Sequence, residues 1–301
     1  MIHRHRLILT HPETVPDMLK QRVITAFLLL LVFLPALFYP DPAPFFGLAL
    51  LLTTAATWEW ARLNGLSAFA SLVGGAMCGG IGMMLWWADL PQASLPRLWL
   101  LVSVLWVLLG GLVLHLGVSA WGRLATPLRL LLGWAALIFT WLAVAQARWV
   151  SVHFLLSVLA LVWAADTGAY FAGRAWGGRW SRGKLAPSIS PGKSWEGVWG
   201  GMVAVVVLAL AWQAHDVATS AIHPGFYTHL GRRSVIVMLL ACTAMAAMSV
   251  LGDLVESLVK RSAGVKDSSA LLPGHGGVLD RMDALLPTLP MAMMLYSIWF
   301  L

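Results

Sequence analysis

Nine almost purely apolar runs, each about 20 residues long, follow one another along the chain. A helix of about 20 apolar residues crosses the roughly 30 Å hydrocarbon core of a bilayer. The composition also indicates a membrane protein, because 59% of the residues are hydrophobic and only 11% are charged. Soluble enzymes, disordered proteins and nucleic-acid-binding modules are therefore excluded. We predict an all-α integral membrane protein, a polytopic bundle of about nine transmembrane helices. The predicted spans are 23–40, 44–61, 68–88, 98–118, 127–146, 150–173, 195–214, 234–256 and 284–301.

The distribution of Lys and Arg between the two sides predicts the orientation of this bundle. With nine alternating spans and the N-terminus inside, 16 of the 20 Lys and Arg residues fall on the inner side. The positive-inside rule therefore predicts a cytoplasmic N-terminus. We divide the chain into an N-terminal membrane region (1–150, about five spans) and a C-terminal catalytic membrane region (151–301, about four spans). The cytoplasmic loops 174–194 and 257–283 of the second region are unusually long and polar.

The end of the eighth span carries a cluster of ionisable and hydroxyl side chains. Asp253, Glu256, Ser257 and Lys260 lie at positions i, i+3, i+4 and i+7, so a continuing helix would place them on one face. A Glu256–Lys260 pair alone would be an ordinary intrahelical ion pair. Ionisable residues at a membrane helix end are costly, so a cluster of them indicates a functional site.

The loop that follows this helix combines cations, carboxylates and glycines. Three glycines surround His275, and glycine permits close approach of the backbone to a ligand. Lys and Arg side chains donate to phosphate oxygens, and carboxylates among them suit a hard cation such as Mg²⁺. The residues therefore predict a site for a polyphosphate and its magnesium ion at the membrane surface, with an ion-paired structural loop as the alternative.

The other polar loop offers a second set of candidate binding residues. Asp166, Tyr170 and Arg174 recur at i, i+4 and i+8, which places them on one helix face. Ser194 is a good N-cap for the seventh span, whose first free N–H groups would face an anion with help from Lys193. This start of a helix predicts a phosphate-binding position.

Segment 257–283, which reads SLVKRSAGVKDSSALLPGHGGVLDRMD, resembles the signature of the phosphatidate cytidylyltransferases, also called CDP-diacylglycerol synthases. Segments 166–171 (DTGAYF) and 184–197 (KLAPSISPGKSWEG) are similar to the other recurrent elements of that family. Segment 58–62 (WEWAR) is a weaker match. The resemblance is strongest over about 160–290, and the first half of the chain matches mainly in being helical and apolar.

The resemblance implies that CTP and phosphatidate react to give CDP-diacylglycerol and pyrophosphate, with Mg²⁺ and a second cation as cofactors. Asp253 and Asp280 would be the metal ligands. The implied catalytic residues are Lys260, Arg261, Lys266, Asp267, His275, Arg281 and Asp283. The implied substrate-binding residues are Ser257, Lys184, Ser190, Lys193, Ser194 and Asp166.

The resemblance also implies a bacterial-type plasma (inner) membrane protein that forms a homodimer and whose active site faces the cytoplasm. Two alternatives stay open. A related nucleotidyl- or phosphotransferase could act on another membrane lipid, such as a polyprenol. A transporter would place its polar residues near the middle of the membrane and often shows internal repeats, whereas here the polar residues gather at predicted helix ends and no repeat is evident.

Overall fold

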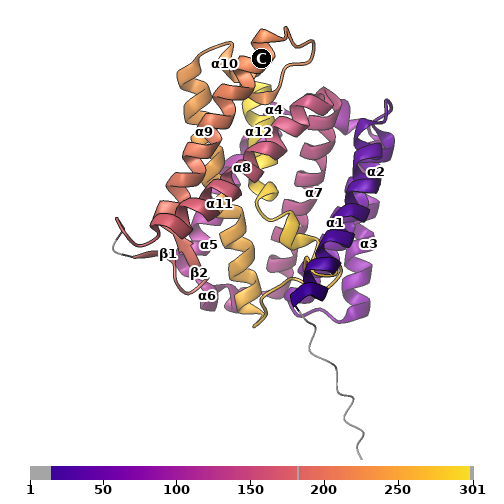
Figure 1. Cartoon of the computed structure of the whole chain (residues 1–301). Helices are drawn as coiled ribbons and strands as arrows, with labels where there is room; N and C mark the ends of the chain where they lie inside the picture. Colours follow the sequence, from indigo (N-terminus) through magenta and orange to yellow (C-terminus); the bar gives the residue numbers. More distant parts are fainter. Residues whose placement is uncertain (1–14, 182, 299–301) are drawn as a thin grey trace, which may run out of the picture.

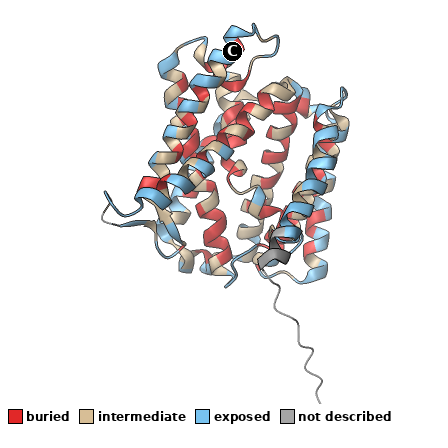
Figure 2. Ribbon diagram, in the orientation of Figure 1, coloured by how far each residue is buried: buried red, intermediate tan, exposed pale blue. Residues whose placement is uncertain are grey.

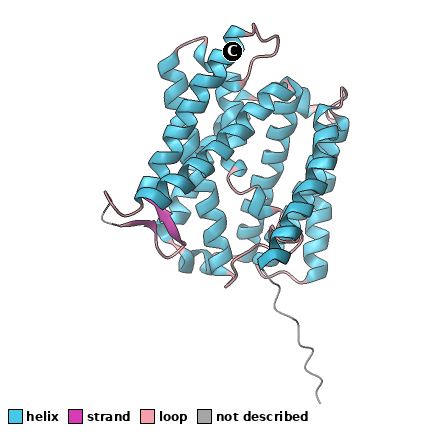
Figure 3. Cartoon of the chain, viewed as in Figure 1, coloured by secondary structure: helices cyan, strands magenta, loops and turns pink. Residues whose placement is uncertain are grey.

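The computed structural model describes residues 15–181 and 183–298, which form a bundle of helices with one small hairpin (Figures 1 and 3). Prolines and hydroxyl caps define several helix starts. Pro96 and Pro127 occupy the first turns of their helices, where no backbone donor is lost. The helical elements are α1 (Val15–Phe38), α2 (Ala43–Leu63), α3 (Ala68–Trp87), η1 (Leu90–Gln92), α4 (Pro96–Leu105), η2 (Trp106–Gly110), α5 (Gly111–Leu116), α6 (Val118–Arg123), α7 (Thr126–Val150), α8 (Val152–Trp176), α9 (Trp195–Ala218), α10 (Phe226–Gly231), α11 (Val235–Ser262), η3 (Leu279–Arg281) and α12 (Leu285–Ile298). The hairpin is β1 (Lys184–Ala186) paired antiparallel with β2 (Ser190–Ser194).

Seven helices in the described residues are long and apolar enough to cross a membrane. They are Lys20–Phe38 of α1, α3, the continuous α4–η2–α5 segment Pro96–Leu116, α7, α8, α9 and α11. The prediction of an all-α polytopic membrane protein is therefore confirmed. The second predicted span coincides with α2, which carries the charged Glu59 and Arg62. The ninth coincides with α12, which has 14 residues, and its last positions 299–301 lie outside the described residues. The count of nine spans stays a prediction.

Apolar side chains cover the outside of the bundle as well as its interior. Leu137, Trp141 and Phe154 are fully buried at the centre, whereas Phe27 of α1 and Leu51 of α2 are each 64% exposed. Figure 2 shows buried residues on the inward faces and exposed ones on the outward faces of the helices. Apolar outer faces on long helices are what a hydrocarbon solvent requires, so this surface supports insertion in a bilayer.

The two ends of the bundle differ in what they carry. The start of α1, α6 and the hairpin lie at one end in Figure 1, and α10 and the end of α12 lie at the other. The two polar loops of the C-terminal half therefore share an end with the start of α1. This arrangement agrees with the alternation that we assumed, and the orientation in the membrane stays a prediction.

Helices α8 and α11 extend beyond the apolar segments that defined the predicted spans. Helix α8 continues to Trp176, and α11 continues to Ser262. The segments predicted as polar loops, 174–194 and 257–283, thus begin within helix, and the division of the chain into two membrane regions stays a prediction. The loop 174–194 also contains the hairpin, whose register pairs Lys184 with Ser194 and Ala186 with Ser190.

Candidate active site

The C-terminal end of α11 presents the polar face that its spacing predicted. Because α11 continues to Ser262, Asp253, Glu256, Ser257 and Lys260 all belong to one helix. The Ser257 hydroxyl donates to Asp253 Oδ1 at 3.2 Å, and Lys260 Nζ lies 2.5 Å from Glu256 Oε2. These i, i+4 pairs confirm that the four residues lie on one side of the helix.

Asp280 connects this helix to the loop that follows it. Lys260 Nζ donates to Asp280 Oδ1 at 2.6 Å. The other carboxylate oxygen accepts from Ser268 N at 2.9 Å, from the Ser268 hydroxyl at 2.9 Å and from Gly277 N at 2.8 Å. Burial would raise the pKa of Asp280, but the hydrogen bonds from Lys260, Gly277 and Ser268 outweigh it and lower the pKa to about 2. Asp280 is therefore a carboxylate held in its charged form.

A polar cavity of about 490 Å³ lies between α8, α11 and the start of α9. Asp166, Arg174, Lys193 and Ser194 line it together with Asp253. Lys193 Nζ is hydrogen-bonded to Asp253 Oδ2, which joins the hairpin to α11. The cavity thus gathers carboxylates and cations from three segments that are distant in the sequence.

Helix packing explains why the walls of this cavity approach so closely. A Cβ on Gly201 of α9 would lie 2.7 Å from the carbonyl oxygen of Ala165 on α8, and a Cβ on Gly168 would lie 2.6 Å from Ala204 Cβ. Glycine at these positions therefore lets the two helices touch backbone to backbone. The Ser194 hydroxyl accepts from Gly197 N at 3.2 Å, which confirms the predicted N-cap of α9.

Asp283 reaches the same region from the segment before α12. The chain crosses α11 at Gly252, where a Cβ would lie 2.4 Å from the Asp283 carbonyl oxygen. Burial raises the pKa of Asp283, and the neighbouring negative charge of Asp253 raises it further. Crowded carboxylates of this kind attract a cation.

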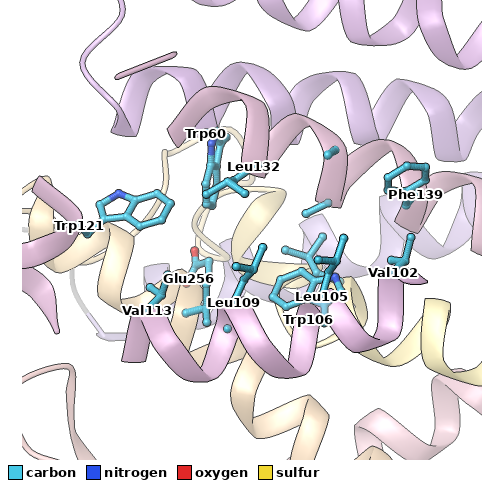
Figure 4. A pocket seen from close by; sticks show the side chains of 16 residues that line it. Trp60, Val102, Leu105, Trp106, Leu109, Val113, Trp121, Leu132, Phe139 and Glu256 are labelled. Carbon is cyan, nitrogen blue, oxygen red and sulfur yellow. The ribbon is translucent and has the colours of Figure 1, made fainter. Parts of the chain in front are cut away.

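A second, apolar cavity of about 130 Å³ is lined in part by Val255 and Glu256 of α11. Trp60, Trp106, Leu109 and Leu132 are among its lining side chains, and Glu256 lies at its edge (Figure 4). Part of its wall is the single π-helical turn η2, and such turns are frequent at functional sites. Helix α11 therefore contributes to the walls of both the polar cavity and the apolar one.

Several predicted site residues lie apart from the polar cavity. Lys184 is exposed on β1, and Ser190 begins β2 where it pairs with Ala186. Neither lines the cavity. Arg261 donates to the carbonyl oxygens of Ile189 at 3.2 Å and Val265 at 2.9 Å, so it ties α11 to the hairpin.

The remaining predicted residues belong to the loop around Asp280. Lys266, Asp267 and Arg281 are exposed. His275 is half-buried, and its Nδ1 atom is buried without a hydrogen-bond partner in the described part of the chain. The structure thus brings together Asp166, Lys193, Ser194, Asp253, Ser257, Lys260, Asp280 and Asp283, and the roles of all predicted site residues stay predictions.

Among the residues that the structure describes, no group of three or more His, Cys, Asp or Glu side chains is arranged to hold a metal ion. The two predicted metal ligands nevertheless have the chemistry that Mg²⁺ requires. Asp253 and Asp280 are oxygen donors, and each has a lysine ammonium as a cationic partner, Lys193 and Lys260 respectively. Both carboxylates therefore already bind positive charge, which fits a cation site.

One charged residue of the site was missed as a candidate. Glu59 of α2 is completely buried and contacts the loop that carries Asp280. The sequence signal that could have identified Glu59 is a carboxylate near the end of an apolar span. Its contacts could not be predicted, because its partners are more than 200 residues away in the sequence.

Comparison with known proteins gives a consistent result. A sequence model of the cytidylyltransferase family matches residues 20–299. The chain is 39% identical to the phosphatidate cytidylyltransferase of Haemophilus influenzae over 297 residues, which cover 91% of this chain and 96% of that protein. It is 39% identical to the phosphatidate cytidylyltransferase of Pseudomonas aeruginosa, over 91% of this chain and 95% of that protein. It is 35% identical to that of Brucella suis, over 79% of this chain and 86% of that protein.

Proposed function

The chain belongs to the cytidylyltransferase family, and we propose that it is a phosphatidate cytidylyltransferase that converts CTP and phosphatidate into CDP-diacylglycerol and pyrophosphate. The observation that carries this proposal beyond the relatives' names is the pair of lysine–carboxylate contacts on α11. One ion pair, Lys193–Asp253, connects the hairpin to the end of α11. The other, Lys260–Asp280, connects the loop after α11 to the same helix end. Two polyanions need such an arrangement of cations to meet.

In this reaction an oxygen of the lipid phosphate forms a bond to the α-phosphorus of CTP. The bond from that phosphorus to the bridging oxygen of the β-phosphate breaks, and pyrophosphate leaves with the electron pair. The lipid phosphate is largely ionised near neutral pH, so no strong general base is needed. The contribution of the protein is to position the two substrates and to neutralise their charge.

The polar cavity supplies the groups for this task. Arg174 and Lys193 line it and can donate to phosphate oxygens. Ser194 caps α9 there, so the first free N–H groups and the positive dipole end of that helix also face an anion. We assign the phosphate groups of the substrates to this cavity, and the predicted contacts of Ser257, Lys260, Arg261, Lys266 and His275 extend the assignment toward the loop.

We assign Mg²⁺ to Asp253 and Asp280, with Asp166 and Asp283 as neighbouring carboxylates. When bound, the ion neutralises phosphate charge and stabilises the charge that develops on pyrophosphate. Asp280 is suited to this role, because the hydrogen bonds from Lys260, Gly277 and Ser268 lower its pKa to about 2 and keep it in the charged form. A second cation remains part of the same proposal.

The lipid substrate explains the surroundings of the site. The outer faces of the helices are apolar, so phosphatidate can diffuse in the bilayer with its acyl chains in hydrocarbon. The apolar cavity beside Glu256 provides hydrocarbon-lined space next to the helix that carries Asp253. The excess of Lys and Arg on the loop side supports an active site that faces the cytoplasm, and the plasma (inner) membrane location is part of the same proposal. The homodimer stays a proposal that the mass of the detergent-solubilised protein would test.

The test is an assay of the purified protein with phosphatidate, CTP and Mg²⁺, in which pyrophosphate release is measured and the lipid product is identified by mass. CDP-diacylglycerol should form with the wild type and collapse with Asp253→Asn. Asp216→Asn is the matched control, because Asp216 is a buried carboxylate at the opposite end of α9.

Three outcomes would contradict the proposal. If folded wild-type protein forms no product with phosphatidate but converts a polyprenyl phosphate, the alternative lipid substrate is correct. Flux of a labelled substrate into sealed vesicles without any new lipid product would favour the transporter. Full activity of Asp253→Asn would remove Asp253 from the metal assignment.

A further inference from the structure

Glu59 is a buried carboxylate of α2, and in the part of the chain that the structure describes its hydrogen-bond partners all come from the loop after α11. Its Oε1 atom accepts from the Ser269 hydroxyl at 2.5 Å and from Val278 N at 3.0 Å. Its Oε2 atom accepts from the Ser268 hydroxyl at 3.1 Å and from Leu279 N at 2.6 Å. Both oxygens are thus satisfied by donors from a single loop, as a buried charge requires.

The same donors surround Asp280. Ser268 donates its N–H to Asp280, and its single hydroxyl proton lies between the carboxylates of Asp280 and Glu59. Leu279 is the residue immediately before Asp280. A Cβ on Gly277 would lie 1.9 Å from Ser268 Oγ and 2.6 Å from Glu59 Oε1, so the packing leaves no room for a side chain there. Glu59 and Asp280 therefore share one tightly packed hydrogen-bond network, and neither can move independently.

Helix α2 is a rigid support for this contact. Trp60, the next residue, is buried and donates from Nε1 to the Arg129 carbonyl oxygen of α7 at 2.9 Å. A Cβ on Gly133 of α7 would lie 1.9 Å from Trp60 Cε2, so the indole ring packs directly against that backbone. The carboxylate at position 59 is thus anchored to the core of the bundle and not to another loop.

Helix α1 holds the same loop at a second point. Arg22 Nε donates to the Gly274 carbonyl oxygen at 3.0 Å, and the Thr25 hydroxyl donates to the Pro273 carbonyl oxygen at 2.9 Å. The first two helices of the chain therefore contact the loop through donors on α1 and through an acceptor on α2.

We propose that Glu59 is a positioning residue for the transfer reaction, because it fixes segment 268–280 and thereby sets the place of Asp280 and of the Lys260 ammonium bound to it. This inference rests on the proposed function. It also assigns to the N-terminal half of the chain a direct part in building the active site. Glu59 acts through the loop, since all of its hydrogen-bond partners among the described residues are loop donors.

The test compares Glu59→Ala and Glu59→Gln with Asp216→Asn in the full-length protein. Asp216 is the matched control, because it is another buried carboxylate that accepts from a loop N–H (Gly225, 2.8 Å) and a hydroxyl (Thr228, 2.6 Å), but at the opposite end of the bundle. Hydrogen exchange of the peptides within 266–283 and kcat/KM for CTP are measured on each variant.

We expect Glu59→Ala to accelerate exchange in 266–283 and to lower kcat/KM for CTP about 100-fold, as loss of positioning does. Glu59→Gln should retain more activity, with a loss of about tenfold, because its amide keeps one acceptor oxygen but turns a donor toward one backbone N–H. Asp216→Asn should leave the exchange of this segment and the kinetics unchanged. If Glu59→Ala does not fold, Ser269→Ala removes a single hydrogen bond to Glu59 and should show the same two effects more weakly.

The proposal is overturned if segment 266–283 exchanges at the wild-type rate in the Glu59 variants. It is equally overturned if their kcat/KM lies within about threefold of that of Asp216→Asn, a difference too small for a displaced loop. Failure of the proposed function would look different, since wild-type protein would then form no CDP-diacylglycerol while the exchange comparison still reported on the loop.

Discussion

Replacing Lys260 with methionine should destabilise the protein by about 3–5 kcal/mol, the range for breaking a buried ion pair from one side. The Lys260 ammonium contacts both Glu256 (2.5 Å) and Asp280 (2.6 Å), whose side chains are 0% and 5% exposed. Asp280 keeps its hydrogen bonds from Ser268 and Gly277 in the variant. Within the described residues Glu256 has no other polar contact, so the variant leaves its carboxyl group buried without a partner, which accounts for most of the loss.

A second substitution should restore much of this stability. Glu256→Gln removes the carboxylate that Lys260→Met leaves without a partner. The destabilisation of the double variant should therefore be smaller, by about 1–3 kcal/mol, than the sum of the destabilisations of the two single variants. Lys193→Met is the matched control. Its partner Asp253 is 30% exposed and also accepts from Ser257, so this change should cost only about 1 kcal/mol or less.

The assay is reversible unfolding in mixed detergent micelles, with pyrophosphate release measured on the folded variants. Lys260→Met and Lys193→Met should both lose activity, and only the first should lose much stability. The reasoning is refuted if Lys260→Met loses no more stability than Lys193→Met, or if Glu256→Gln fails to recover any of the loss.

Three further predictions concern other contacts. Gly277→Ala should lower the free energy of unfolding by about 1–3 kcal/mol and remove most of the transfer activity, because the new Cβ would lie 1.9 Å from Ser268 Oγ. Thermal unfolding and product formation test this prediction, and an unfolding temperature equal to that of the wild type would contradict it. Arg148→Met should lower stability by about 1.5–3 kcal/mol for each of the two lost hydrogen bonds to the carbonyl oxygens of Leu37 and Tyr39, without changing activity per folded molecule. Equal stability of variant and wild type would disprove this. Chelation of divalent cations should abolish pyrophosphate release and added Mg²⁺ should restore it, and activity that survives chelation would rule out the magnesium assignment.

Local sequence patterns were sufficient for most of the helical structure. Apolar runs of about 20 residues mark a spanning helix wherever they occur, since every backbone N–H and C=O must be paired within the segment. The spacing from Asp253 to Lys260 likewise placed four side chains on one face, because helical geometry fixes that relation over seven residues. Ser194 was identifiable as a helix cap for the same local reason.

The ends of helices were less predictable. Helix α11 runs to Ser262 and α8 to Trp176, beyond the apolar segments that defined the spans. Apolarity reports where the hydrocarbon ends, whereas helix formation continues into polar sequence as long as backbone hydrogen bonds and side-chain partners are available. The hairpin within 174–194 has no comparable signal, because it has only three and five residues in its strands.

By itself, the sequence determined that this is a helical membrane protein and which family it resembles, and it predicted candidate site residues at the ends of α8 and α11 and in the segments that follow them. Only the tertiary structure decided that Lys193 meets Asp253 across 60 residues and that Glu59 meets Leu279 across 220. The physical reason is that periodicity acts over a few turns, whereas these contacts depend on how helices pack. In a bilayer that packing rests on small residues such as Gly201 and Gly252 and on buried polar partners, since lipid is as apolar as the helix surfaces and no hydrophobic effect drives the helices together.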